Sequence, residues 1–331
     1  LDGLNGVPGP NLRSELNADL LRTLLGNAPT GRLTLLNGHV FAPSRDFAKQ
    51  GEFVAEQDSG LTLRNMTWAN SGRIQWNSTR SLAGTTATLN NLPSGIVEFT
   101  TDAGVTFISN IAGRLSLNNE GVVRKAAGSG DSVFDALFNH RGGVIEVDTG
   151  KLRLLNTTTG TGGRFLVDEG ATLDLIVSGS NTLTGTYVGT GGGSIVHLGS
   201  LTIGAGGATF DFPPSQYQWL SGSLGGQTLT NVNTMTLLTN GFKRFQNGSL
   251  LNQGTIDVVG PAVLNATQGT FTNQAGAFLN LRSDGDVSFV PNTAGRLNLV
   301  NSGTIRKTDG NDSSLLDVSL TNNGVIVSES G

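Results

Sequence analysis

Residues 295–307 read GRLNLVNSGTIRK, and residues 113–125 read GRLSLNNEGVVRK, with identical residues at 8 of 13 positions. Position 113 thus corresponds to position 295, and the similarity continues on both sides of the two stretches with nearly the same offset. Residues 61–150 therefore recur as residues 243–331. A duplication of this length is typical of repeat architectures, in which one structural unit stacks on the next.

A shorter unit repeats inside each copy, with a pattern that is roughly Asn-x-Gly followed by alternating apolar and polar residues. Its glycines are Gly72, Gly95, Gly121 and Gly143, then Gly254, Gly276, Gly303 and Gly324. They are spaced by 23, 26 and 22 residues in the first copy and by 22, 27 and 21 in the second. Alternation predicts half-buried strands, and Asn and Gly predict tight turns because both tolerate positive φ. Short strands every 21–27 residues predict an all-β fold, a single-stranded parallel β-helix (β-solenoid).

The predicted solenoid covers residues 38–331 and has a glycine-rich middle, residues 151–242, between the two long repeats. Residues 1–37 form an N-terminal segment, in which leucines at helical spacing predict a short helix over residues 10–29. Such a helix would cap the open end of the solenoid. An irregular segment, or a strand of a preceding coil, explains the same residues. At the other end the motif stops without a cap, so we expect the array to continue in a longer protein or to meet another subunit.

The composition excludes several classes of protein. Charged residues are 14% of the chain, and glycine accounts for 48 of 331 residues, which predicts a thin core under a surface of Thr, Ser and Asn. The net charge of −4 disfavours nucleic acid as a partner. The chain has no Cys, and no apolar run approaches the roughly 18 residues of a membrane-spanning helix.

We find no motif for catalysis, cofactor binding or metal binding. The glycine-rich stretches GTGGRF (160–165) and GTGGGS (189–194) lack the remaining residues of a phosphate-binding loop. The three histidines, His39, His140 and His197, are far apart. Threonine pairs of the T-x-T type do not recur at constant spacing, which disfavours an ice-binding face. We therefore predict no catalytic residue, no cofactor, no metal site and no enzymatic activity.

Charged residues recur at matching positions of the two copies. Because a catalytic site is a single asymmetric arrangement, we interpret these residues as structural. The aspartates are predicted to close turns, and the Arg-Lys pairs are predicted to face water and keep a strand surface soluble. The matching residues are Asp102 with Asp284, Asp135 with Asp317, and Arg124–Lys125 with Arg306–Lys307.

Aromatic residues offer a possible ligand or assembly surface. The stretch PPSQYQWLSGSLGG (213–226) gathers Tyr217 and Trp219 and predicts a kink or a protruding loop. We predict that these two side chains form the surface. Trp68 and Trp76 are the other candidates, although Trp76 aligns with Val258 and is therefore predicted to face inward.

The phrase LxNxGTIRKTxG…LxNNGxIxV resembles the β-solenoid repeats of adhesin-like and autotransporter-passenger-like regions in large bacterial secreted and cell-surface proteins. The resemblance covers residues 60–331 and carries no functional residue across. It implies a right-handed parallel β-helix that lies outside the cell or on its surface and acts as a stalk, an adhesin or a fibre unit. End-to-end self-association and binding of surface glycans are the partners it suggests. A carbohydrate-active β-helix, either a polysaccharide lyase or a glycan-binding spike, is the alternative; a scaffold for an active domain elsewhere is a third.

Overall fold

The computed structural model describes residues 32–35, 40–41, 47–108, 113–156, 159–177, 180–238, 241–259, 263–282, 284–289 and 295–331. This part of the chain is a parallel β-solenoid of about 12 turns that contains no helix, so the predicted fold is confirmed. The helix predicted over residues 10–29 lies outside the described residues. The chain divides into two compact units, residues 1–156 and residues 157–331.

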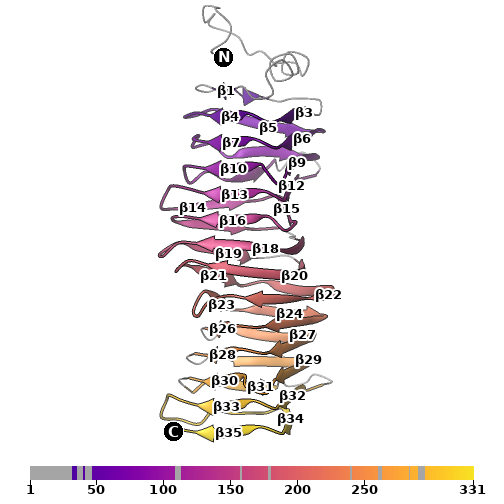
Figure 1. Ribbon diagram of the computed structural model, residues 1–331, viewed down its shortest axis with the longest axis vertical. Helices are drawn as coiled ribbons and strands as arrows, with labels where there is room; N and C mark the ends of the chain where they lie inside the picture. Colours follow the sequence, from indigo (N-terminus) through magenta and orange to yellow (C-terminus); the bar gives the residue numbers. More distant parts are fainter. Residues whose placement is uncertain are drawn as a thin grey trace, which may run out of the picture. The chain divides into compact units, whose positions relative to one another are not determined.

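In the first unit, each complete coil contains three short strands, and strands of successive coils lie side by side (Figure 1). For example, β7, β8 and β9 form one coil, and β10, β11 and β12 form the next. The strands are β1 (Arg32–Leu35), β2 (Val40–Phe41), β3 (Phe47–Lys49), β4 (Glu52–Ala55), β5 (Gly60–Arg64), β6 (Thr67–Asn70), β7 (Arg73–Trp76), β8 (Leu82–Thr85), β9 (Ala87–Asn91), β10 (Ile96–Phe99), β11 (Val105–Phe107), β12 (Leu115–Asn119), β13 (Val122–Lys125), β14 (Asp131–Phe134), β15 (Leu137–His140), β16 (Val144–Val147) and β17 (Lys151–Leu154).

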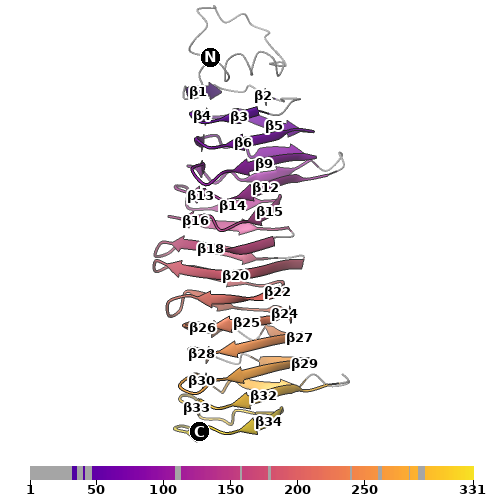
Figure 2. The same ribbon diagram turned by 45° about the vertical axis from the view of Figure 1, so that its right-hand side comes forward.

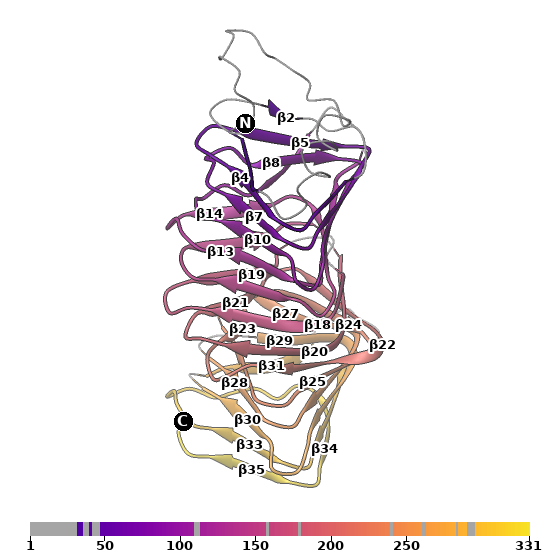
Figure 3. The same ribbon diagram turned by 45° about the horizontal axis from the view of Figure 1, so that its top comes forward.

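In the second unit, several strands run on around a corner of the coil and are therefore longer. Figure 3 shows this unit obliquely, with β30, β33 and β35 stacked on one face and β34 on another. The strands are β18 (Thr159–Val167), β19 (Thr172–Ile176), β20 (Ser180–Thr190), β21 (Ser194–His197), β22 (Ser200–Asp211), β23 (Tyr217–Trp219), β24 (Gly222–Gly226), β25 (Thr228–Asn231), β26 (Thr234–Leu237), β27 (Phe242–Asn252), β28 (Thr255–Val258), β29 (Val263–Asn273), β30 (Phe278–Leu281), β31 (Asp286–Phe289), β32 (Leu297–Asn301), β33 (Thr304–Lys307), β34 (Ser319–Asn322) and β35 (Val325–Ser328).

The pairing register matches the predicted coil length. Ile96 pairs with Arg73 of the preceding coil and with Val122 of the following coil. The steps from 73 to 96 and from 96 to 122 equal the steps between the motif glycines at positions 72, 95 and 121. One coil of the second unit is shorter than any predicted coil, because Gln218 pairs with Thr236. Few residues separate consecutive strands in that coil.

Alternation along each strand builds the core from columns of apolar side chains that stack from coil to coil. In the first unit, one such column consists of Phe53, Ile74, Val97, Val123 and Ile145, all of them buried and paired in register. Complete burial of such a side chain stabilises the fold by about 1.5–3 kcal/mol. Polar residues at the intervening positions face outward.

The glycines of the Asn-x-Gly motif have a different role from the predicted one. Of the eight, only Gly276 has a positive φ, of 83°. At Gly72, Gly121 and Gly254, a Cβ atom would lie far inside van der Waals contact with a carbonyl oxygen of the preceding coil. These glycines are required because neighbouring coils approach too closely for any side chain. The prediction that they supply positive φ is therefore wrong for seven of the eight.

Candidate functional site

Tyr217 and Trp219, the predicted ligand surface, lie inside the second unit and are each 1% exposed. Both belong to β23, whose alternation turns them inward while Gln218 faces outward. The stretch 213–226 consists of a turn at residues 214–216 followed by β23 and β24, and the burial of Tyr217 and Trp219 contradicts the prediction of a surface at these two residues. Trp68 and Trp76 are also buried, as predicted for Trp76.

His197 joins these two aromatic side chains in the core. Tyr217 Oη donates to His197 Nδ1 at 2.9 Å, and His197 Nε2 donates to the carbonyl oxygen of Gly199 at 2.9 Å. The ring of Trp219 stacks on the imidazole at 5.1 Å between centroids. Burial lowers the pKa of His197 to about 3 and raises the pKa of Tyr217. Both groups are therefore neutral at physiological pH and hold the coil together.

A row of hydrogen-bonded asparagines, ended in one case by a histidine, runs through each unit, and we call these rows the asparagine ladders; all members except Asn322 are buried. In the first ladder, Nδ2 of each asparagine donates to Oδ1 of the next at 2.8 Å, and the last asparagine contacts Nδ1 of His140 at 3.3 Å. In the second ladder, the corresponding distances are 2.7 or 2.8 Å. The members are Asn70, Asn91, Asn119 and His140 in the first, and Asn231, Asn252, Asn273, Asn301 and Asn322 in the second.

Each ladder asparagine except Asn322 also donates to a backbone carbonyl of the following coil. Asn91 Nδ2, for example, donates to the carbonyl oxygen of Val122 at 2.9 Å. Five of these asparagines are the first residues of an Asn-x-Gly motif, which the sequence pattern assigns to turns: Asn70, Asn119, Asn252, Asn301 and Asn322. The available signal was the spacing of the ladder members, which is 21, 28 and 21 residues in both copies. A buried amide is costly to leave without its hydrogen bonds, so the ladder fixes the register of adjacent coils.

Two lysines of the matching Arg-Lys pairs are buried and bind aspartate. Lys125 Nζ lies 2.8 Å from Asp102 Oδ1, and Lys307 Nζ lies 2.6 Å from Asp284 Oδ1. The lysines lower the pKa of both aspartates. The prediction that the lysines face water is wrong, because alternation places each on the inward side of its strand, two residues after a core residue such as Val123.

The same Lys–Asp pairs, which we call the Lys–Asp corners, also close the loop that follows each lysine. Lys125 Nζ also donates to the carbonyl oxygen of Ala127, and Asp102 Oδ1 accepts from the backbone N–H of Gly130 at 3.0 Å. In the second copy, Lys307 Nζ donates to the carbonyl oxygen of Asp309. One carboxylate and one ammonium therefore tie a turn to the coil beneath it.

The second matching pair of aspartates binds arginine. Arg114 Nε lies 3.0 Å from Asp135 Oδ1, and Arg296 Nη1 contacts Asp317 Oδ1. Both pairs join neighbouring coils, with 21 residues between the partners. The duplication has thus preserved a second coil-to-coil contact.

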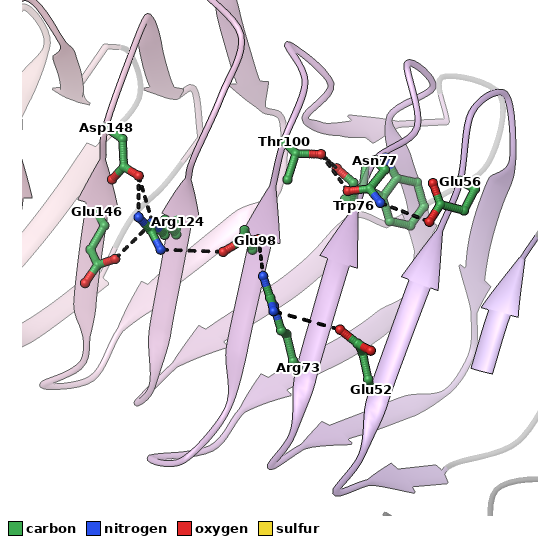
Figure 4. A network of polar contacts seen from close by, with 10 residues as sticks. All are labelled: Glu52, Glu56, Arg73, Trp76, Asn77, Glu98, Thr100, Arg124, Glu146 and Asp148. Carbon is green, nitrogen blue, oxygen red and sulfur yellow. Dashed lines mark hydrogen bonds and ion pairs between the residues drawn. The ribbon is translucent and has the colours of Figure 1, made fainter. Parts of the chain in front are cut away.

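The outward face of the first unit carries a charged strip, defined as Glu52, Arg73, Glu98, Arg124, Glu146 and Asp148 (Figure 4). Glu98 lies between the two arginines, 2.6 Å from Arg73 Nη2 and 3.7 Å from Arg124 Nη1. Arg124 also binds Asp148 Oδ2 at 2.5 Å. Acid and base alternate across five successive coils, and the side chain of Glu98 is only 7% exposed as a result.

Most charged groups of the strip bind one another and are therefore not available to a ligand. Both guanidinium groups are bound to carboxylates of neighbouring coils, and burial of Glu98 leaves little room for a ligand. Among the described residues, no group of three or more His, Asp or Glu side chains is arranged to hold a metal ion. The strip is chemically suited to joining coils.

The last coil of the described chain exposes apolar side chains that are buried elsewhere. Ile326 of β35 is 48% exposed, whereas Ile145, its counterpart in the first copy, is 0% exposed. Leu320 of β34 is also exposed, and its counterpart Phe138 is buried. Within the described residues, β34 pairs only with β32 and β35 pairs only with β33.

No helix among the described residues is long and apolar enough to cross a membrane. Comparisons with protein-family models, with curated proteins and with solved structures each returned no match.

Proposed function

We propose that this chain is an extracellular or cell-surface structural protein, a β-helical stalk or fibre segment that associates end to end. The resemblance of its repeats to those of adhesin-like and autotransporter-passenger-like regions supports the location. The arrangement of its polar residues supports the structural role.

One observation carries the proposal: the polar contacts that both copies share join one coil to the next. The asparagine ladders, the Lys–Asp corners and the Arg–Asp pairs all recur at the offset of the duplication. Two carboxylate positions of the charged strip differ instead, with Glu98 opposite Asn280 and Glu146 opposite Val327 in the two copies. The contacts that join neighbouring coils are thus the same in both copies. This is expected of a protein whose function depends on the rigid stack of coils itself.

End-to-end association would use the coil of β34 and β35. Its inward positions carry Leu320 and Ile326, and Asn322 continues the second asparagine ladder to this face. An open strand edge and an apolar interior favour pairing with another strand. We propose a second copy of the chain as the occupant. A further coil of a longer chain would use the same groups.

A carbohydrate-active β-helix is the competing function, and the charged strip is the feature that favours it. Solenoid lyases place acids and bases on one outward face, an argument from fold alone. Glu98 is the best-placed carboxylate of the strip, but its oxygens are already bound by two guanidinium groups.

Sedimentation velocity over a range of protein concentrations, combined with electron microscopy, tests the proposal. We expect oligomers that grow along one axis and that Ile326→Lys abolishes, because a charge would then lie in the buried interface. Val327→Lys is the matched control, since Val327 is the next residue on β35 and faces outward. A chain that stays monomeric at all concentrations contradicts end-to-end association. Release of unsaturated sugars from an acidic polysaccharide, lost in Glu98→Gln, would establish the lyase instead.

A further inference from the structure

Five adjacent strands of the second unit present an uncharged face to solvent. These strands are β25, the second half of β27, the second half of β29, β32 and β34, which pair in parallel register (Figure 2). Their outward residues form two columns, which we call the hydroxyl face. One column is Thr228, Ser249, Thr270, Asn298 and Ser319, and the other is Thr230, Leu251, Thr272, Val300 and Thr321.

The orientation of the hydroxyl face follows from its buried neighbours. Leu250, Phe271 and Leu299 lie between the two columns in sequence and are all buried, so the flanking residues point outward. Seven of the ten residues bear a hydroxyl group, and none is charged. The closest charges along β32 and β34 are Arg296 and Asp317, which pair with each other at the border.

Two threonine pairs lie on this face. Thr228 and Thr230 lie two coils from Thr270 and Thr272, with Ser249 and Leu251 between them. The other three strands carry no threonine pair, so the expectation that such pairs do not recur regularly from coil to coil is not contradicted. Coils differ in length within their turns, whereas the strand register stays fixed.

The hydroxyl face has two regular repeats. Adjacent coils are about 4.8 Å apart, and alternate residues on one strand are about 6.7 Å apart. β-Branched side chains hold few χ1 rotamers, so the threonine hydroxyl and methyl groups occupy defined positions. The result is a rigid two-dimensional lattice of neutral donors, acceptors and methyl groups.

The chemistry of this lattice selects its partner. Its lack of charge matches a neutral partner and excludes recognition of polyanions, which requires basic side chains. Sugars are commonly held by stacking on aromatic rings, and all three Trp and both Tyr residues of the chain are buried. A hydrophobic protein partner would require a far more apolar patch. The remaining kind of partner is itself neutral, ordered and able to form hydrogen bonds.

We propose that the hydroxyl face binds ice. Threonine hydroxyls anchor water molecules at the two repeats, and the intervening methyl groups keep these waters in ordered positions that merge with the ice surface. The column that contains Thr230 continues to Thr209 of β22 and Thr186 of β20, which extends it beyond the ten residues.

Partition of the purified chain between a slowly growing ice shell and the remaining liquid tests this proposal. We expect the protein to concentrate in the ice, and we expect Thr272→Tyr and Thr270→Tyr each to lower that fraction at least tenfold, because a large ring breaks the lattice. Thr255→Tyr is the matched control, since Thr255 is a half-buried outward threonine on β28, a different face. Thermal unfolding of each variant separates loss of binding from loss of fold.

Three outcomes overturn the proposal. The first is a wild-type protein that ice excludes as it excludes an inert protein, a result that does not depend on any variant. The second is an equal loss of binding in Thr255→Tyr. The third is a Thr272→Tyr variant that partitions into ice like the wild type but has lost binding to crystalline cellulose or chitin, or has lost dimerisation in sedimentation. None of these results bears on the growth of oligomers through Ile326.

Discussion

Lys125 Nζ lies 2.8 Å from Asp102 Oδ1, and the lysine side chain is wholly buried while the aspartate side chain is half exposed. The pair is therefore asymmetric. If the aspartate is removed, the ammonium stays inside the coil without its counter-charge. If the lysine is removed, the aspartate can be hydrated.

This asymmetry predicts the order of two mutational effects. Asp102→Ala is expected to lower the free energy of unfolding by about 3 kcal/mol, because it leaves a buried charge uncompensated. Lys125→Met is expected to cost about 1–2 kcal/mol, chiefly because the carbonyl oxygen of Ala127 loses its donor. Urea unfolding measures both, with Lys151→Met on β17 as the control. Equal effects, or the reverse order, would contradict the asymmetry.

His140 predicts a loss of stability in acid. It occupies the place in the first ladder that Asn322 occupies in the second copy, and burial lowers its pKa to about 4. Below pH 6.5 the unfolded chain binds a proton that the folded chain excludes. The free energy of unfolding therefore falls as the pH drops from 6.5 to about 4, by about 3 kcal/mol from this group.

His140→Asn isolates that contribution. Asparagine preserves the ladder, so stability at pH 7 is expected to change by less than about 1 kcal/mol, while the loss between pH 6.5 and 4 becomes smaller. Unfolding by urea at several pH values measures the difference from the wild type. The remaining acid sensitivity comes from groups such as His197 and Asp102. An unchanged pH profile in the variant would show that His140 is not neutral in the fold.

The sequence predicts the fold well because coil length and strand alternation are both periodic. The glycine spacings around Gly95 and Gly121 equal the register steps between strands, so the solenoid could be read directly from the repeat. Periodicity does not depend on any single side chain. The repeat can therefore be recognised in the sequence even where substitutions make individual contacts unpredictable.

Individual side chains are harder to predict because their direction depends on the parity of one strand. The charge of Lys125 predicts that it faces water, yet it lies two residues after Val123 and must face the same way. Tyr217 and Trp219 follow the same parity rule. The hydroxyl face was missed because its columns mix threonine with serine, asparagine, leucine and valine, so that no single residue type repeats from coil to coil.

Gly121 tests the inference that motif glycines are required by close approach of the coils. A Cβ atom at this position would overlap the carbonyl oxygen of Gly95. Gly121→Ala is therefore expected to cost about 2 kcal/mol or more, although its φ is acceptable for alanine. Gly192→Ala is the control, because its φ is also ordinary and a Cβ atom there would make only van der Waals contacts with Glu169. Thermal unfolding distinguishes the two variants. Similar melting temperatures would mean that the backbone relaxes to admit a methyl group.

Glu98 tests whether the charged strip stabilises the first unit. Glu98→Gln keeps the shape of the side chain but removes the charge shared by Arg73 and Arg124. Because both arginines are partly exposed, the expected cost is about 1 kcal/mol at low salt, and it should shrink at about 1 M sodium chloride, where ion pairs are screened. Glu146→Gln is the control, since Arg124 retains Asp148 when Glu146 is neutralised. Urea is the denaturant of choice because it adds no ions. A cost for Glu98→Gln that does not vary with salt would assign its effect to packing rather than to charge.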